Sequence, residues 1–298
     1  MKTAVPGMIS CIITERRSDM EETYLTQAII GRYAQNLYEE EKSSRTIEKY
    51  LRDVQHFARY LAGEPVTKER AIAYKQHLTE QGYAPRSINS MLASLNSFLT
   101  FCGRTDCKVK LCRMQREIYL PEEKELSRAE YLRLLQAAEG DRRLWLLLQT
   151  ICATGIRVSE LQYFTVEAAR RGEISVACKN KTRKILIPAK LQKLLLRYAG
   201  RSGITGGVIF RTRTGRPMNR SHIWAAMKAL CQRADVNPDK VFPHNLRKLF
   251  ARTFYSLDKD IAKLADVLGH SSINTTRIYI MTTGQEHRKQ MERLRLLA

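Results

Sequence analysis

The sequence lacks several features by which common classes of protein are recognised. No apolar run reaches the roughly 20 residues that cross a membrane as a helix, so we expect no membrane association. The seven cysteines include no CxxC pair, and Cys107 and Cys112 have no histidine at the spacing of a zinc site. There is also no P-loop and no acidic cluster suited to a metal ion. We therefore expect neither a cofactor nor a bound metal.

The sequence also lacks signs of export. An odd number of scattered cysteines is typical of reduced thiols rather than of a disulfide framework, and this predicts a cytoplasmic protein. Residues 3–14 are mildly apolar but have no convincing cleavage site, so we do not expect a signal peptide there. We interpret residues 1–20 as an N-terminal tail, and both Met1 and Met20 are candidate start residues.

Positive charge is the feature that the chain has in excess. Lysine and arginine total 51 against 30 acidic residues, a net charge of +21. Residues 1–113 hold 17 basic and 13 acidic side chains, and residues 114–298 hold 34 and 17. Such a field attracts a polyanion, and nucleic acid is the first candidate. The net charge alone is also compatible with a basic protein that does not bind nucleic acid.

The first part of the chain reads as a compact domain of four helices. With 44% hydrophobic residues in 298, the chain can bury one large core or two ordinary ones. Apolar residues recur at helical spacing over residues 21–113, and Pro85 suits the first turn of the last helix. The predicted helices cover residues 24–38, 44–61, 67–82 and 85–102.

A charged linker, residues 114–125, precedes a second domain over residues 126–298. Ser127 and Glu130 form a capping box at its start. Two short strands are expected around the basic sequence KNKTR, over residues 172–178 and 184–188. The predicted helices cover residues 128–138, 142–154, 189–199, 219–234, 244–256, 259–268 and 283–296. The predicted fold class is therefore mainly α with a small β-sheet.

The first notable motif is ATGIRVSEL, residues 153–161. Gly155 can end the preceding helix, and Ser159 with Glu160 can begin another. Arg157 then lies in a sharp turn, where short backbone on both sides aims its guanidinium in advance. The alternative is an ordinary surface arginine between two helices.

The second motif is FPHNLRKLFA, residues 242–251. Pro243 can start a helix, so His244 and Arg247 share a face near its positive end. Helix amides, an imidazole and a planar cation would converge there, which suits a phosphate. The alternative is a capping histidine beside a solvated arginine.

The third motif is LGHSSINTTRIYI, residues 268–280. Gly269 can end one helix, and the two threonines before Arg277 are expected to precede a short helix that bears Tyr279. His270 lies in the turn, nine residues before the tyrosine. Alone, a tyrosine between isoleucines is more often a core aromatic.

The order of these residues resembles that of the tyrosine recombinase (phage integrase) family, from about residue 24 to the end. Its pattern is an arginine, a lysine, His-x-x-Arg, Gly-His and a tyrosine. The resemblance implies an N-terminal four-helix core-binding domain, SAM-like and similar to that of Xer-type recombinases. It also implies a C-terminal mixed α/β catalytic domain.

The resemblance also assigns roles to the site residues. Arg157 and Arg247 would clamp a phosphate, with His244 and His270 as its hydrogen-bonding partners. Tyr279 would be the nucleophile, forming a 3′-phosphotyrosyl bond. The bond energy is retained in that intermediate, so rejoining would need neither ATP nor a metal.

The family's catalytic lysine lies in a β-turn, which leaves two candidates here. Counting from Gly172 along the first strand favours Lys179, whereas counting back from Pro188 also admits Lys181. Lys248 departs from the family pattern, which usually has a second histidine there. That position normally supports the site, so activity is still expected.

The implied function is site-specific recombination of double-stranded DNA by a homo- or hetero-tetramer on paired sites. The size, the short N-terminus and the lack of an arm-binding domain favour a Xer-like protein with a role in chromosome partition. The alternatives are a phage or transposon integrase, a type IB topoisomerase, a metal-dependent nuclease, or a non-catalytic DNA-binding relative. An inactive relative would typically have lost Tyr279 or one arginine, and all are present.

Overall fold

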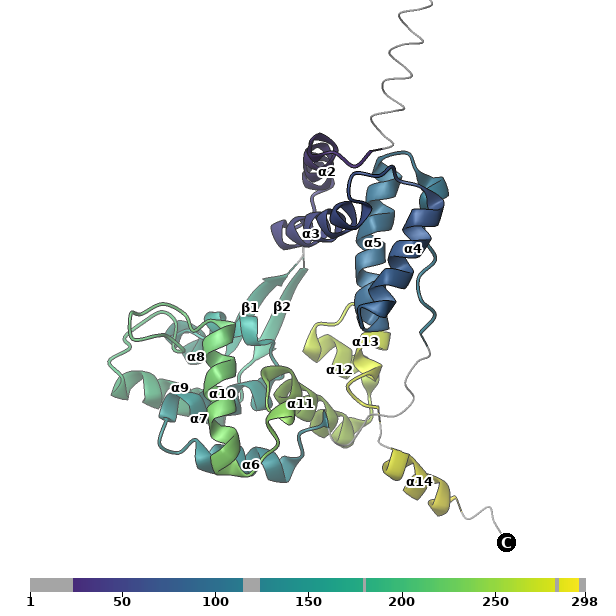
Figure 1. Cartoon of the computed structure of the whole chain (residues 1–298). Coiled ribbons are helices and arrows are strands. Elements are labelled where there is room, and N and C mark those ends of the chain that lie inside the picture. Colours follow the sequence, from purple (N-terminus) through teal and green to yellow (C-terminus); the bar gives the residue numbers. More distant parts are fainter. Residues whose placement is uncertain (1–23, 115–123, 179–180, 282–283, 295–298) are drawn as a thin grey trace, which may run out of the picture. The chain divides into compact units, whose positions relative to one another are not determined.

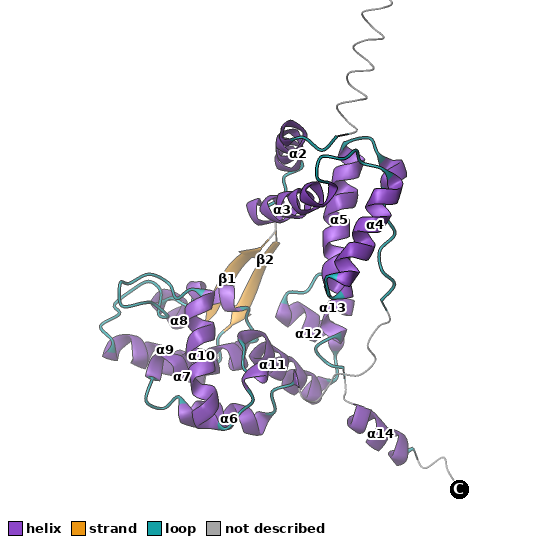
Figure 2. Cartoon of the chain, viewed as in Figure 1, coloured by secondary structure: helices purple, strands orange, loops and turns teal. Residues whose placement is uncertain are grey.

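The computed structural model describes residues 24–114, 124–178, 181–281 and 284–294. These residues form two compact units, which divide between residues 114 and 124 (Figure 1). Both units are built of helices, and the second also contains a two-stranded sheet (Figure 2). The predicted class, mainly α with a small sheet, is confirmed.

The first unit is helical, and polar side chains set where its helices begin. Thr26, Ser43 and Thr67 each accept a hydrogen bond from the backbone of the first turn, and Pro85 occupies the first turn of the last long helix. The elements are α2 (Gln27–Glu39), α3 (Ser44–Leu61), α4 (Lys68–Glu80), α5 (Pro85–Phe101) and the 3₁₀ helix η1 (Thr105–Cys107).

The second unit contains the remaining helices. Its predicted capping box is present, because Ser127 and Glu130 exchange hydrogen bonds at the start of α6. The helices are α6 (Arg128–Ala137), α7 (Arg142–Thr154), η3 (Val158–Tyr163), α8 (Val166–Arg171), α9 (Ala189–Arg201), α10 (Arg220–Ala234), η4 (Pro238–Lys240), α11 (Pro243–Asp258), α12 (Ile261–Leu268), α13 (Ile273–Arg277) and α14 (Gly284–Arg293).

An antiparallel hairpin of β1 (Glu173–Cys178) and β2 (Lys181–Leu186) forms the sheet. Its register pairs Glu173 with Leu186 and Cys178 with Lys181. The second strand therefore begins three residues earlier than the predicted residue 184 and ends two earlier than 188. An antiparallel ladder tolerates polar side chains on its solvent face, so pairing continues through the basic residues that were interpreted as a turn.

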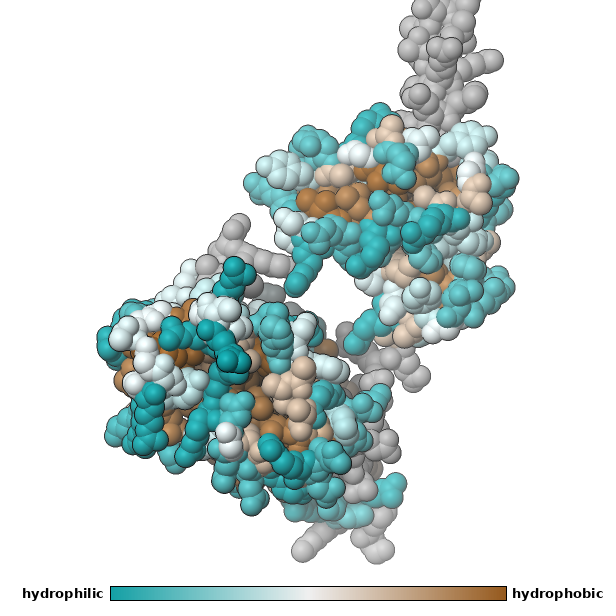
Figure 3. All heavy atoms as spheres, turned by 60° about the vertical axis from the view of Figure 1, so that its left-hand side comes forward, coloured by the Kyte–Doolittle hydropathy of each residue, from teal (hydrophilic) through white to brown (hydrophobic). Residues whose placement is uncertain are grey.

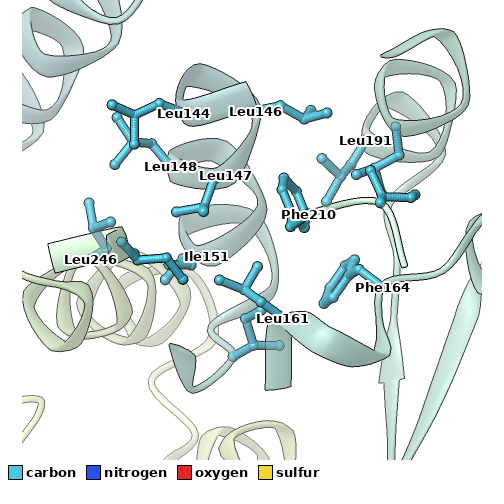
Figure 4. Packing of buried hydrophobic residues seen from close by; sticks show 14 of the residues in the cluster. Leu144, Leu146, Leu147, Leu148, Ile151, Leu161, Phe164, Leu191, Phe210 and Leu246 are labelled. Carbon is cyan, nitrogen blue, oxygen red and sulfur yellow. The ribbon is translucent and has the colours of Figure 1, made fainter. Parts of the chain in front are cut away.

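Helix α7 is the centre of the second unit's core. Its residues Leu147 and Ile151 are fully buried, and they lie between Leu246 of α11 on one side and Phe210 on the other (Figure 4). Burial of each such side chain stabilises the fold by about 1.5–3 kcal/mol. The end of α7 and the start of α11 are therefore held rigidly, and both lead directly to the predicted site.

Hydrophilic residues cover most of the visible face of each unit, with smaller apolar areas between them (Figure 3). In the part of the chain that the structure describes, no helix is both long and apolar enough to cross a membrane.

Candidate active site

Arg157 lies in the turn after α7, as predicted. Gly155 ends α7 with a positive φ of 62°, and a Cβ there would collide with the ring of Phe250, so only glycine fits. The side chain of Arg157 is 40% exposed. It donates to Glu160 Oε1 at 3.1 Å and to the carbonyl oxygen of Gly269 at 3.3 Å. The exposed part of this guanidinium can accept an anionic ligand.

Arg247 differs from the solvated arginine of the sequence-based alternative, because only 1% of it is exposed. Its Nη1 donates to the Gly155 carbonyl at 2.5 Å, and its Nη2 donates to the Leu268 carbonyl at 2.7 Å and to His270 Nε2 at 3.0 Å. Burial, and then the charge of Arg157, lowers the pKa of Arg247 to about 10. Its Nε is buried with no hydrogen-bond partner among the described residues.

The contacts of His270 define its protonation. Because Nε2 accepts from Arg247, Nδ1 carries the hydrogen and donates it to Oγ1 of the buried Thr276 at 2.9 Å. Burial, followed by the charges of Arg247 and Arg157, lowers the pKa of His270 to about 4. The ring is therefore neutral near pH 7, with its position fixed at both nitrogens.

The prediction that Tyr279 lies on a helix preceded by two threonines is wrong. Thr275 and Thr276 lie inside α13, which ends at Arg277, and Tyr279 follows in a turn. The Tyr279 amide donates to the Thr276 carbonyl at 2.9 Å, and the Ile280 amide donates to that of Arg277 at 3.2 Å. These bonds span three residues, so the chain tightens and leaves the α-helix before the tyrosine.

Tyr279 is only 7% exposed and packs in a small apolar cluster. The centroid of its ring lies 5.2 Å from that of His244 and 5.1 Å from that of His270. The guanidinium carbon of Arg247 lies 5.9 Å from the same centroid. Partial burial, and then the charges of Lys248 and Arg247, lowers the pKa of His244. The second and third motifs therefore converge around one phenol ring, and Arg157 of the first motif donates to the Gly269 carbonyl beside His270.

Lys179, the preferred candidate for the catalytic lysine, lies outside the described residues. Lys181, the alternative, begins β2, and the structure describes its backbone but not its side chain. Lys248 lies on α11, where its Nζ is 3.8 Å from Oε1 of the buried Glu125.

Two residues of the site were missed by the sequence analysis. Glu160 is 5% exposed and accepts from Arg157 and, at 2.6 Å, from Arg183. The three-residue spacing from Arg157 could have revealed Glu160 as its partner. No signal of that kind exists for Arg183, because its place depends on the strand register.

The arrangement suits an anion that reacts with a phenol. Arg247 and two imidazoles lie around Tyr279, and Arg157 and Arg183 both pair with the buried carboxylate of Glu160. Among the residues that the structure describes, no group of three His, Cys, Asp or Glu side chains is placed to hold a metal ion.

Comparison with protein families confirms the resemblance. The model of the phage integrase family matches residues 124–286, and the model of the phage integrase N-terminal SAM-like domain matches residues 30–105. The first match alone covers more than half of the chain. The chain therefore belongs to the phage integrase family and is an enzyme of the tyrosine recombinase class.

The curated relatives include Xer recombinases. Tyrosine recombinase XerD of Xanthomonas campestris pv. campestris is 30% identical over 86% of this chain and 88% of its own length. Tyrosine recombinase XerA of Pyrococcus furiosus is 28% identical over 93% and 98%. Among solved structures, a lambda integrase dimer bound to a COC′ core site matches with a TM-score of 0.70 and 19% identity, over 90% of this chain and 80% of that one. That last likeness shows the fold alone.

Proposed function

We propose that this protein cuts and rejoins strands of duplex DNA through a covalent bond to Tyr279. The observation that carries this proposal is the convergence of His244, Arg247 and His270 on the ring of Tyr279. Arg157 belongs to the same group, because it donates to the carbonyl next to His270. We assign residues 21–113 to core binding, residues 114–125 to the linker and residues 126–298 to catalysis.

The chemistry begins with binding of a phosphodiester by Arg157 and Arg247. The phosphate gains negative charge in its pentavalent transition state, and each guanidinium stabilises that added charge. The Tyr279 oxygen attacks phosphorus while the bond to the 5′ oxygen breaks. A normal tyrosine pKa of about 10 makes the phenol a poor nucleophile, so a neighbour must accept its proton. His244, kept neutral near pH 7 by its lowered pKa, is suited to this, whereas both ring nitrogens of His270 are already engaged by Arg247 and Thr276.

The leaving 5′ oxygen needs a proton. A lysine on the hairpin of β1 and β2 can supply it, and we assign Lys179 to this role, with Lys181 as the alternative. The products are a 3′-phosphotyrosyl bond and a free 5′-hydroxyl. Attack by the 5′-hydroxyl of another strand reverses the step and rejoins the DNA, so the phosphodiester energy is conserved.

The charge of the second unit supports a DNA partner. Residues 174–234 contain 14 lysines and arginines and no aspartate or glutamate. Within this segment, a small hairpin presents Arg213 and Arg216 to solvent. Its turn is fixed because the Thr212 amide donates to the Arg216 carbonyl at 2.7 Å. Solvent-exposed cations on a defined backbone favour binding to phosphates.

Assembly and biological role follow as further parts of this proposal. We propose a homo- or hetero-tetramer on paired sites, acting in the cytoplasm in chromosome partition, as in a Xer-like recombinase. The competing role is that of an integrase of a phage or transposon. DNA flanking the gene separates them, because a mobile-element end beside the gene would indicate an integrase.

The test of the reaction is Tyr279→Phe on a nicked suicide substrate. The wild-type protein should form a covalent adduct on a denaturing gel, whereas the variant should form none. Its DNA affinity should stay nearly unchanged, since only one hydroxyl is removed. Persistence of the covalent adduct in the variant would contradict the assignment of Tyr279 as the nucleophile.

A further inference from the structure

The C-terminal end of α12 is surrounded by arginines. The carbonyls of residues 267, 268 and 269 are consecutive, and each accepts a hydrogen bond from a different guanidinium. The donors are Arg183 to Val267 at 3.0 Å, Arg247 to Leu268 at 2.7 Å, and Arg157 to Gly269 at 3.3 Å. The free carbonyls at a helix C-terminus carry partial negative charge, so this end of α12 attracts all three cations.

Arg183 joins this turn to a second part of the site. It is on β2, and its Nη2 donates to Glu160 Oε2 at 2.6 Å, while Glu160 also binds Arg157. The stem of Arg183 packs on Gly269, where a Cβ would collide with it. One side chain therefore links β2, the carboxylate that holds Arg157, and the turn that leads into His270.

Arg183 is less exposed than Arg157, and both of its Nη atoms donate to acceptors within the protein. Its side chain is 13% exposed, compared with 40% for Arg157. Its charge also opposes the site in one respect, because it contributes to lowering the pKa of Arg247. Repulsion from the neighbouring arginines destabilises a buried cation at this position. The hydrogen bonds that the planar guanidinium makes to Val267 and Glu160 offset that repulsion.

We infer that Arg183 is a positioning residue that locks β2 and the Gly269–His270 turn onto Glu160, and thereby aims Arg157 at the reacting phosphate. This inference rests on the proposed function. Arg183 acts through Arg157 and His270 and is not itself required to touch the DNA.

The first test is single-turnover cleavage at saturating DNA by Arg183→Met, which keeps the apolar stem and removes the fork. The rate of adduct formation should fall at least about tenfold, since misplaced catalytic groups lose much of their effect. DNA affinity should stay within about threefold of wild type. Arg183→Lys should recover only part of the rate, because an ammonium lacks the rigid fork that spans both acceptors.

The matched control is Arg133→Met. Arg133 donates to the carbonyls of Ala234 and Asp235 at the end of α10, at 3.0 and 2.9 Å, so its loss removes similar bonds at another helix end. Its cleavage rate should match wild type. An unchanged rate in Arg183→Met, or an affinity that falls as much as its rate, would overturn the inference.

A second measurement does not depend on activity. The amides of Gly269 and His270 donate to Asp266 and Ala265, and hydrogen exchange reports how firmly that turn is held. Exchange there should be at least about tenfold faster in Arg183→Met and unchanged in the control. If the wild-type protein forms no adduct, the proposed function fails, yet exchange still decides whether Arg183 holds the turn. Unchanged exchange in Arg183→Met would refute that role.

Discussion

Arg157 and Arg247 have the same proposed role but very different surroundings. Arg157 is partly exposed at the edge of the site, whereas Arg247 is enclosed and satisfies two backbone carbonyls. Removal of either should remove one stabilising cation from the transition state. Removal of Arg247 should also leave two buried carbonyls without their donors, which costs about 1–3 kcal/mol each.

We therefore expect Arg157→Ala and Arg247→Ala each to slow cleavage by at least about a hundredfold, the scale of one electrostatic stabiliser. Only Arg247→Ala should also lower the free energy of unfolding markedly. Lysine at either position should restore little activity, because a point charge lacks the bidentate fork. Single-turnover cleavage and urea unfolding measure the two effects. Cleavage within a few-fold of wild type in either alanine variant would count against a phosphate clamp.

At the residue scale, the order of motifs predicted His244, Arg247 and His270 as partners of Tyr279 in one site, and the structure places these side chains around its ring. That order could not give their environment. The burial of Arg247 depends on Gly155 and Leu268, which approach it only in the folded unit. The tautomer of His270 likewise depends on Thr276, a buried residue of the short helix α13 that approaches the ring only in the folded unit.

At the element scale, helices with a clear apolar stripe and a polar cap were predicted to within a few residues, as for α3 and α7. The errors lie where helical periodicity stops. The residues after Arg157 form the 3₁₀ helix η3, and Tyr279 lies beyond α13, because hydrogen bonds over three residues replace those over four. The short helix α8 was missed, since six residues give too little periodicity.

Helix α14 offers a prediction at this scale. Met291 of this otherwise polar helix and Leu294, which directly follows it, are large apolar residues, yet they are 60% and 61% exposed. In the proposed tetramer, they would dock on a neighbouring protomer in a head-to-tail contact that can close a ring. The same segment follows Tyr279 in the chain, so docking would couple activity to assembly.

Truncation after Thr283 should therefore weaken cooperative binding to DNA with two paired sites. Binding to a single site should stay mostly unchanged, because no proposed phosphate contact is removed. Native gels of full-length and truncated protein on one-site and two-site DNA measure both quantities. Met291→Ser with Leu294→Ser should reproduce the effect without shortening the chain. Equal cooperativity in all three proteins would leave α14 with no role in assembly.

At the scale of the whole molecule, the distribution of charge is the feature that sequence alone established most fully. The excess of basic residues lies in the second part of the chain, and its acid-free segment, residues 174–234, extends from β1 through α10. The structure adds which of these basic side chains are buried in the site and which are exposed to solvent. Arg183 of this segment is used inside the site, whereas Arg213 and Arg216 face solvent. Only the latter kind can neutralise phosphates along a duplex.

Affinity for duplex DNA should therefore fall steeply as salt rises, because each neutralised phosphate releases condensed counterions. Replacement of Arg213 and Arg216 together by alanine should reduce the log–log slope of affinity against salt by about 1 to 2, since each contact accounts for roughly 0.9. Arg170→Ala with Arg171→Ala is the matched control, because it removes the same charge from exposed arginines outside the acid-free segment. Its slope should equal that of wild type.

Fluorescence anisotropy over a salt series measures all three proteins. A nearly flat wild-type slope would show that the net charge of +21 serves another purpose. Equal changes in the two double variants would show that the hairpin has no special contact with DNA.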